Sequence, residues 1–141
     1  MFLYDTEHLG VIQRQSQPGF QNILRRVSTF PASSFFVSII SFQEEVQGGQ
    51  AQLARTRKPA EITYAYSRLR KVIQNFAQVQ LLDFDLAASD RFEQLRLQRI
   101  RIGTLDLRIA SIAQVHGFTV LTRNVRDFRL VPGLNVEDWT Q

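Results

Sequence analysis

The chain has 141 residues, 44% of them hydrophobic, which favours one compact domain over residues 1–141 rather than a disordered chain. It contains no cysteine, and this excludes disulfides, thiolate catalysis and cysteine-bound metals. Lys and Arg number 17 against 13 Asp and Glu, a net charge of +4 that is typical either of a solvated basic surface or of a protein with a polyanionic substrate.

No segment of the chain has the composition of a membrane span or a signal peptide. Its apolar runs are shorter than the roughly 18 residues that a membrane span needs. The first residues, Met1-Phe-Leu-Tyr-Asp5, include an acid and lack a basic segment. We therefore expect a cytoplasmic protein with no membrane partner.

The first predicted strand ends at an acid. Residues 2–4 are apolar and indicate a buried strand, and Asp5 follows directly. A helix is predicted from Thr6, with Leu9 and Ile12 on its apolar face, and Asp5 is suited to cap it. Because ligands of open parallel sheets bind outside the carboxyl ends of the strands, Asp5 is also a candidate site residue.

A second acid, Glu44, follows the second predicted strand. Residues 34–40 are apolar and β-branched, which indicates a central strand. Ser41 and Glu44 then have the spacing of a capping box, in which the serine caps a helix and the glutamate reaches back to it. Glu44 therefore has a local structural interpretation, and also a functional one in which it points into the same cleft as Asp5.

Several other elements before residue 100 are predicted to be structural. They are a helix over 20–27 after a break at Pro18-Gly19, a helix tail and loop over 50–58, a long helix over 60–77, a strand over 80–84 and a helix capped by Asp85. In the long helix Tyr66 and Ile73 are expected to face inward. In the helix after Asp85, Leu97 is a candidate core residue.

The segment Ile102-Gly-Thr-Leu-Asp-Leu-Arg-Ile-Ala-Ser-Ile-Ala113 is predicted to be a helix that packs closely on the sheet. Gly103 indicates a turn before it, and Thr104 indicates a hydroxyl cap. Asp106 lies in the first turn, where an acid complements the positive end of the helix dipole. The helix is expected to end near His116-Gly117, with glycine as its C-cap.

Polar residues also follow the strand predicted over residues 118–122. Asn124 and Asp127 lie in a turn-like segment after this strand, and turn chemistry alone accounts for them. A last edge strand is expected over 134–139, with Trp139 at the rim. The alternation of strands and helices predicts an α/β fold, with a central parallel sheet of four to five strands flanked by helices.

Three acids thus lie at junctions of strands, turns and helices, namely Asp5, Glu44 and Asp106, and a fourth polar position lies at Asn124–Asp127. A parallel sheet gathers its strand ends at one edge, where crowded carboxylates repel one another unless a divalent cation neutralises them. Oxygen donors without Cys or His clusters favour Mg²⁺ or Mn²⁺. An acidic metal pocket on a basic protein is typical of a nuclease that uses a metal-activated water.

Four segments carry a resemblance to a known family. They are Leu3-Tyr-Asp-Thr-Glu-His-Leu9, Val37-Ser-Ile-Ile-Ser-Phe-Gln-Glu-Glu-Val-Gln-Gly48, the segment 102–113, and Leu121-Thr-Arg-Asn-Val-Arg-Asp-Phe128 followed by Val131-Pro-Gly-Leu-Asn-Val-Glu-Asp-Trp139. In this order and together, they resemble PIN-domain ribonucleases of the VapC toxin type. The resemblance implies a PIN-like fold and a Mg²⁺-dependent endoribonuclease, with Mn²⁺ as an alternative, that leaves a 3′-hydroxyl and a 5′-phosphate. It also implies a homodimer and a small antitoxin partner that blocks the cleft.

The resemblance further implies roles for individual residues. The implied catalytic residues are Asp5, Glu44, Asp106, Thr122, Asn124 and Asp127. The implied metal ligands are Asp5, Asp106, Glu44 and Asp127, the last two binding directly or through water. Asn124 and Asp127 both remain candidates for the fourth position, and Asp127 is the better carboxylate. Glu7 departs from the family pattern, in which many relatives have Asn beside the first ligand.

Other functions stay open at this stage. One is a catalytically weak PIN-like domain that binds RNA or a protein partner. Another is a different Mg²⁺-dependent phosphohydrolase, although such enzymes usually carry Asp-x-Asp after the first strand, where this chain has Asp5-Thr-Glu7. A third is a structural domain whose acids are all caps. By their charge, Arg101, Arg108 and Arg123 are candidates for phosphate contacts.

Overall fold

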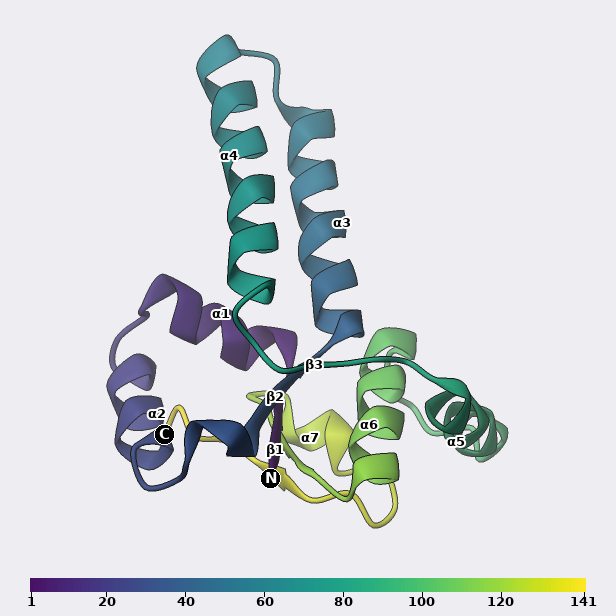
Figure 1. The fold of residues 1–141 in the computed structure, drawn as a ribbon. Helices are drawn as coiled ribbons and strands as arrows, with labels where there is room; N and C mark the ends of the chain where they lie inside the picture. Colours follow the sequence, from purple (N-terminus) through teal and green to yellow (C-terminus); the bar gives the residue numbers. More distant parts are fainter.

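The fold is built on a parallel sheet of five strands, seen in Figure 1 for residues 1–141, all of which the computed structural model describes. The strands are β1 (Phe2–Tyr4), β2 (Phe35–Ser38), β3 (Leu81–Leu82), β4 (Thr119–Leu121) and β5 (Val136–Glu137). Their order is β3-β2-β1-β4-β5, so the first strand lies at the centre. The predicted α/β class and parallel sheet are confirmed, with five strands.

Seven α-helices and one short 3-10 helix connect the strands. They are α1 (Thr6–Arg14), α2 (Gly19–Val27), the 3-10 helix η1 (Ala32–Ser34), α3 (Ile39–Arg55), α4 (Pro59–Phe76), α5 (Leu86–Leu97), α6 (Thr104–His116) and α7 (Val125–Phe128). Figure 1 shows α1 and α2 on one side of the sheet and α5 and α6 on the other. The hairpin of α3 and α4 projects away from the sheet.

The register of the sheet aligns the carboxyl ends of its three inner strands. Tyr4 pairs with Val37 of β2 and with Leu121 of β4. The backbone N–H of Asp5 donates to the Leu121 carbonyl at 3.0 Å, which extends the contact between β1 and β4 by one residue. The residues that follow β1 and β4, including Asp5 and Thr122, therefore meet at one edge of the sheet.

Two apolar clusters provide the core. The first contains most of the inner face of α6, where Ile109, Ile112 and Ala113 have no exposed surface. The second joins α1, α2 and the C-terminal segment through residues such as Ile23 and Trp139, which are 1% and 2% exposed. Because burial of apolar surface is the main stabilising term in folding, α6 is a firmly held element. Its first turn carries Asp106.

The hairpin of α3 and α4 agrees with the helix tail and loop predicted over 50–58, since α3 continues to Arg55 and α4 begins at Pro59. Gly49 is buried, and a Cβ atom at this position would overlap the Leu69 side chain, so glycine allows α4 to approach closely. The prediction that Tyr66 and Ile73 face inward is wrong, since they are 61% and 65% exposed. The hairpin stands clear of the sheet, and only one side of α4 is covered.

Four other local predictions differ from the structure. Thr104 is the first residue of α6, and Gly103 holds the N-cap position without a side-chain hydrogen bond. Leu97 is 73% exposed because it lies at the end of α5, away from its buried face. Trp139 is buried rather than at the rim. The segment expected to be turn-like contains the short helix α7.

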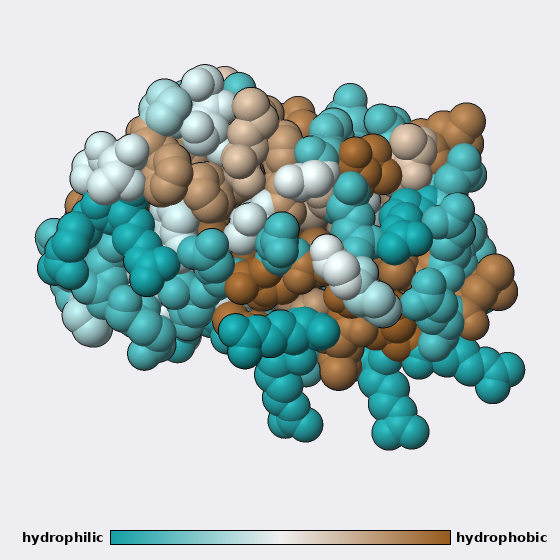
Figure 2. Space-filling model, turned by 90° about the horizontal axis from the view of Figure 1, so that it is seen from below, coloured by the Kyte–Doolittle hydropathy of each residue, from teal (hydrophilic) through white to brown (hydrophobic).

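The surface mixes apolar and polar side chains. Figure 2 shows one face, seen from below, on which hydrophobic and hydrophilic residues are interspersed and long hydrophilic side chains project outward. Two of the most exposed hydrophobic side chains, Leu86 at 76% and Leu97 at 73%, belong to α5. Among the helices, none combines the length and the apolar character needed to cross a membrane.

Candidate active site

Asp5 is the most firmly held of the predicted site residues. It lies between the end of β1 and the start of α1, and it is 3% exposed. Its Oδ1 accepts the backbone N–H of His8 at 2.8 Å, which caps the helix, and its Oδ2 accepts the Thr122 hydroxyl at 2.5 Å. The capping and site interpretations therefore coexist, because the bond that caps α1 also orients the carboxylate.

Asn124, in the segment after β4, connects two more carboxylates to the Asp5 region, Asp127 of α7 and Asp106 of α6. The backbone N–H of Asn124 donates to the Thr122 Oγ1 at 2.9 Å and so fixes the turn. The Asn124 amide donates to Asp127 Oδ2 at 3.1 Å and lies 3.5 Å from Asp106 Oδ2. A neutral amide thus lies between two acids that come from different helices, α6 and α7.

Glu44 reaches the site from α3 by a different route from the one predicted. Its Oε1 accepts the Thr6 hydroxyl at 2.8 Å. The expected capping box of Ser41 and Glu44 is wrong, because α3 already begins at Ile39 and Ser38 is its N-cap, accepting the Ser41 N–H at 3.2 Å. Glu44 consequently lies in the second turn of α3, where it is not needed to cap the helix.

The acids repel one another and have no cationic partner. Burial is the main cause that raises the pKa of Asp5 to about 7; hydrogen bonds from His8 and Thr122 act against it, and the nearby acids Glu7 and Asp106 act with it. Burial and then the charge of Glu44 raise the pKa of Asp106 to about 6. The pKa of Glu44 is also raised, first by burial. The two ion pairs of the structure, Arg26–Glu137 and Arg96–Glu93, join other residues, so these carboxylates lack a counter-ion within the chain.

The six predicted site residues thus lie in one region, where they form two separate groups of hydrogen-bonded side chains. Asp5, Thr122, Asn124, Asp106 and Asp127 form one set, and Glu44 with Thr6 forms the other. No three His, Asp or Glu side chains are arranged to hold a metal ion together. Each carboxylate instead accepts a hydroxyl, amide or backbone donor. The donor set nevertheless fits Mg²⁺ or Mn²⁺, since it consists of uncompensated oxygen ligands.

Sequence reasoning missed one contact of the site, and one of its candidates for phosphate contacts packs against aromatic rings. It did not single out Thr6, whose hydroxyl holds Glu44. The only available signal was a hydroxyl residue directly after the first acid. Arg108, proposed for phosphate contacts, has its guanidinium 5.4 Å from the centre of the Phe92 ring and 5.9 Å from that of Phe84. The Arg108 guanidinium therefore makes cation–π contacts that help to pack α6 against α5.

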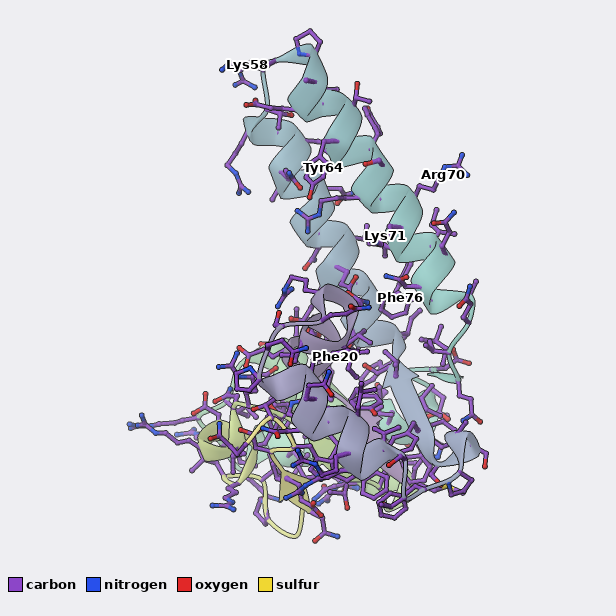
Figure 3. The ribbon with its side chains drawn as sticks, turned by 90° about the vertical axis from the view of Figure 1, so that its left-hand side faces the viewer. Phe20, Lys58, Tyr64, Arg70, Lys71 and Phe76 are labelled. Carbon is purple, nitrogen blue, oxygen red and sulfur yellow. The ribbon has the colours of Figure 1, made fainter.

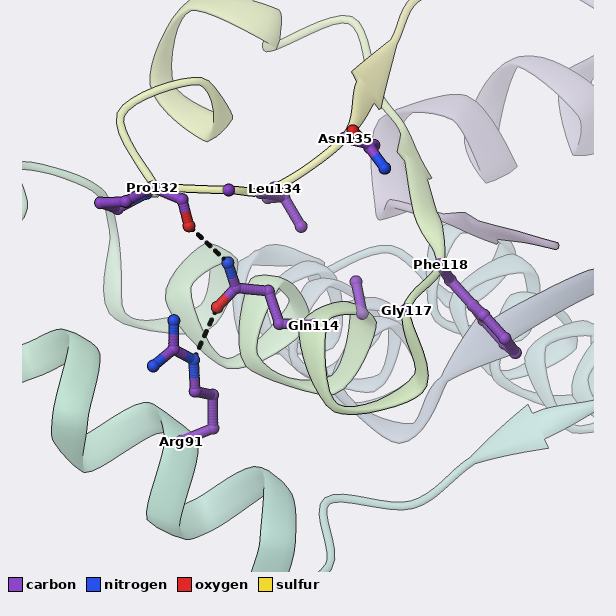
Figure 4. Close-up of a pocket in the computed structure, with 9 residues that line it drawn as sticks. Arg91, Gln114, Gly117, Phe118, Pro132, Leu134 and Asn135 are labelled. Carbon is purple, nitrogen blue, oxygen red and sulfur yellow. Dashed lines mark hydrogen bonds between the residues drawn. The ribbon is translucent and has the colours of Figure 1, made fainter.

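A different hollow, shown in Figure 4, lies away from the acids. It is lined by residues of α5, α6 and the segment before β5, and its volume is about 380 Å³. Arg91 Nε donates to the Gln114 Oε1 at 2.7 Å, and the Gln114 amide donates to the Pro132 carbonyl at 2.7 Å. Both ends of the glutamine are satisfied, so this hollow is a structural junction rather than a second site.

The raised pKa of Asp106 predicts how pH changes stability in the presence of a chelator. Asp106 ionises near 3.8 when unfolded and near 6 when folded, so its ionisation lowers the stability of the fold as pH rises through this interval. Asp106→Asn is therefore expected to raise Tm by a few degrees at about pH 7.5 and by clearly less at about pH 4. The opposite pH dependence of His8 is present in both proteins and cancels. Scanning calorimetry at both pH values measures the difference, and an equal effect at both contradicts it.

A family model matches most of the chain. The model described as PIN domain aligns with residues 14–134. This range contains Glu44, Asp106, Asn124 and Asp127, and it begins after Asp5.

Individual proteins are also similar to the chain. The tRNA(fMet)-specific endonuclease VapC of Salmonella typhimurium is 32% identical over 111 residues, which are 76% of this chain and 76% of that protein. A protein of the same name from Shigella flexneri is 35% identical over 86 residues, 57% of this chain and 65% of that protein. The crystal structure of DNA-bound VapBC from Salmonella typhimurium has a TM-score of 0.74 and 26% identity, covering 98% of this chain and 97% of that one.

Proposed function

The chain belongs to the PIN domain family, in its VapC type, and we propose that it is an endoribonuclease toxin that hydrolyses RNA phosphodiester bonds with the help of Mg²⁺ or Mn²⁺. The names of the relatives support a nuclease, and the similar structure is a complex of VapC with its partner VapB. The site residues, the metal dependence and the RNA substrate are the parts of this proposal that go beyond family membership.

The observation that carries the proposal is a set of one buried and two half-buried acids without a counter-ion. Ionised Asp5, Glu44 and Asp106 are unfavourable in this environment, as their raised pKa values indicate. A protein that retains such a set gains nothing in stability from it, whereas a divalent cation would neutralise it. Strain of this kind is common at functional sites.

In the proposed reaction, Asp5 and Asp106 would hold the cation, and Glu44 and Asp127 would bind it directly or through water. A cation bound there supplies a more acidic water and stabilises negative charge on the phosphoryl oxygens. Thr122 and the His8 backbone fix the direction of the Asp5 carboxylate. The Asn124 amide lies between the carboxylates of Asp106 and Asp127 and donates a hydrogen bond to Asp127.

The purified chain is expected to cleave RNA only when a divalent cation is present. Initiator tRNA is a suitable first substrate because the relatives are named for it. Cleavage is followed with Mg²⁺, with Mn²⁺ and with excess EDTA, and the fragment ends are mapped. We expect 5′-phosphate and 3′-hydroxyl ends and complete loss of cleavage with EDTA. Cleavage that resists EDTA contradicts the proposal, and RNA binding without cleavage favours the catalytically weak alternative.

We also propose that a small antitoxin segment binds an apolar groove beside the site. This groove, of about 520 Å³, lies between α1, α2 and β2, and 11 of its 14 lining residues are hydrophobic. A contiguous apolar surface of this kind is typical of a protein interaction site, and Leu24 on its wall is 42% exposed. The exposed Leu86 and Leu97 of α5 support the proposal that a second copy of the chain completes the assembly.

A further inference from the structure

A second polar pocket lies beside the acidic site. It is about 380 Å³ in volume and is formed where the end of α1, the second turn of α3 and residues 64–75 of α4 meet. Its charged and aromatic lining consists of Arg14, Glu45, Tyr64, Arg68 and Lys71, and it is called the basic pocket below. None of these residues belongs to the predicted catalytic set.

The cations of the basic pocket are free to bind an anion. Arg14, Arg68 and Lys71 take part in none of the ion pairs of the structure. The Arg68 guanidinium donates to the side-chain oxygen of Gln52, a neutral group. The single acid, Glu45, is half-buried and accepts the Gln13 amide at 3.0 Å. Three positive charges against one negative charge therefore face the pocket.

The pocket also offers an aromatic surface. Tyr64 is 59% exposed although it lies at the wall of a pocket. Figure 3 shows Tyr64 and Lys71 along the same side of the hairpin, whereas Arg70 projects to another side. An exposed ring beside free arginine and lysine side chains is the combination that proteins use for single-stranded nucleic acid. The ring stacks with a base, and the cations contact the phosphates.

The basic pocket and the acidic site are close enough for one extended strand to contact both. Asp5 and Arg14 lie at opposite ends of α1, which are about 13 Å apart at the rise of an α-helix. Glu44 and Glu45 are neighbours on α3, and they belong to the acidic site and to the basic pocket respectively. The hairpin adds little negative charge to the pocket, because residues 46–76 have Glu61 as their only acid.

We propose that the basic pocket binds a phosphate and the adjacent unpaired base of the RNA strand, a few nucleotides from the bond that is cleaved. This proposal rests on the ribonuclease function proposed above. A protein segment is less well matched, because the pocket is lined mainly by polar and charged residues whereas the lining of the groove beside α2 is mainly hydrophobic. The basic pocket would then contribute to the choice of the cleavage position, since a base bound there sets the register of the strand.

The test measures RNA binding by full-length protein that carries Asp106→Asn, so that the RNA stays intact. Fluorescence anisotropy with a labelled single-stranded RNA gives Kd over a range of salt concentrations. Lys71→Gln and Arg68→Gln are each expected to weaken binding about 5-fold and to reduce the slope of log K against log salt by about 0.7. Tyr64→Ala is expected to weaken it about 10-fold, and Tyr64→Phe to restore binding.

Arg70→Gln is the matched control, because it removes one charge from the same helix on a side that does not line the pocket. We expect its Kd and salt slope to equal those of the parent. Lys71→Arg keeps the charge and is expected to bind RNA normally, and Tm of every variant shows that binding is not lost through unfolding. Pocket variants that bind RNA as Arg70→Gln does overturn the proposal.

Two further outcomes separate this inference from the proposed function. If the pocket variants bind RNA normally but fail to retain a co-expressed antitoxin, the pocket belongs to the protein partner and the proposal is overturned. If wild-type protein cleaves no RNA, the nuclease function fails. Selective loss of RNA binding by the pocket variants would still support an RNA site at the basic pocket in that case.

Discussion

Asp5→Asn is expected to slow RNA cleavage by about 1,000-fold or more while the protein stays folded. The Asp5 carboxylate is 3% exposed and is held by the His8 N–H and the Thr122 hydroxyl. Asparagine has the same shape and keeps an oxygen to cap α1, but it removes the negative charge that a divalent cation needs. Single-turnover cleavage at saturating Mg²⁺ measures the effect on the chemical step.

Asp90→Asn is the matched control, since it neutralises an exposed acid on α5 and is expected to cleave at the wild-type rate. The Tm of Asp5→Asn should equal or exceed that of wild type at neutral pH, because burial raises the pKa of this carboxyl to about 7 and its ionisation disfavours the fold. Cleavage by Asp5→Asn within about 10-fold of wild type would show that Asp5 is not a metal ligand.

The parallel sheet and the neighbourhood of Asp5 were predictable because they follow from local rules. Alternating strands and helices indicate parallel order, and parallel order places the residues after β1 and β4 at one edge. The contact between Asp5 and Thr122 expresses this rule directly. Helix caps were also predictable where a single residue determines them. Asp85 caps α5 by accepting the Ala88 N–H, and Gly117 ends α6 with a φ of 68°.

Predictions that depended on tertiary packing were less successful. The sequence of α4 has an apolar pattern, but the burial of Tyr66 and Ile73 would have required a partner that this single chain does not supply. The start of α3 was misplaced because Ser38 and Ser41 are both suitable N-cap residues. The strand β2 ends at Ser38, earlier than predicted, and Ser38 therefore takes the N-cap position. The basic pocket combines side chains from three helices, so no contiguous motif could indicate it.

Trp139→Ala is expected to lower the free energy of unfolding by about 3–5 kcal/mol, the largest stability effect that we predict for a single side chain. The indole is 2% exposed, lies 4.7 Å from the Phe2 ring centre, and donates from Nε1 to Glu137 at 2.7 Å. Its removal leaves a cavity against β1, which is the central strand. Urea denaturation followed by circular dichroism measures the loss.

Trp139 also connects the C-terminal segment to the acidic site, and this link distinguishes its contribution from that of an ordinary core residue. Its backbone N–H donates to the His8 Nε2 at 3.1 Å, and the N–H of His8 caps α1 at Asp5. Burial lowers the pKa of His8 to about 4, and the ring has no other hydrogen-bond partner, so loss of this bond would leave both of its nitrogens unpaired. Trp139→Phe keeps an aromatic ring that packs the C-terminal segment against the core. It is therefore expected to lose clearly less stability than Trp139→Ala. Equal losses for the two variants would mean that the large side chain does not hold the segment against His8.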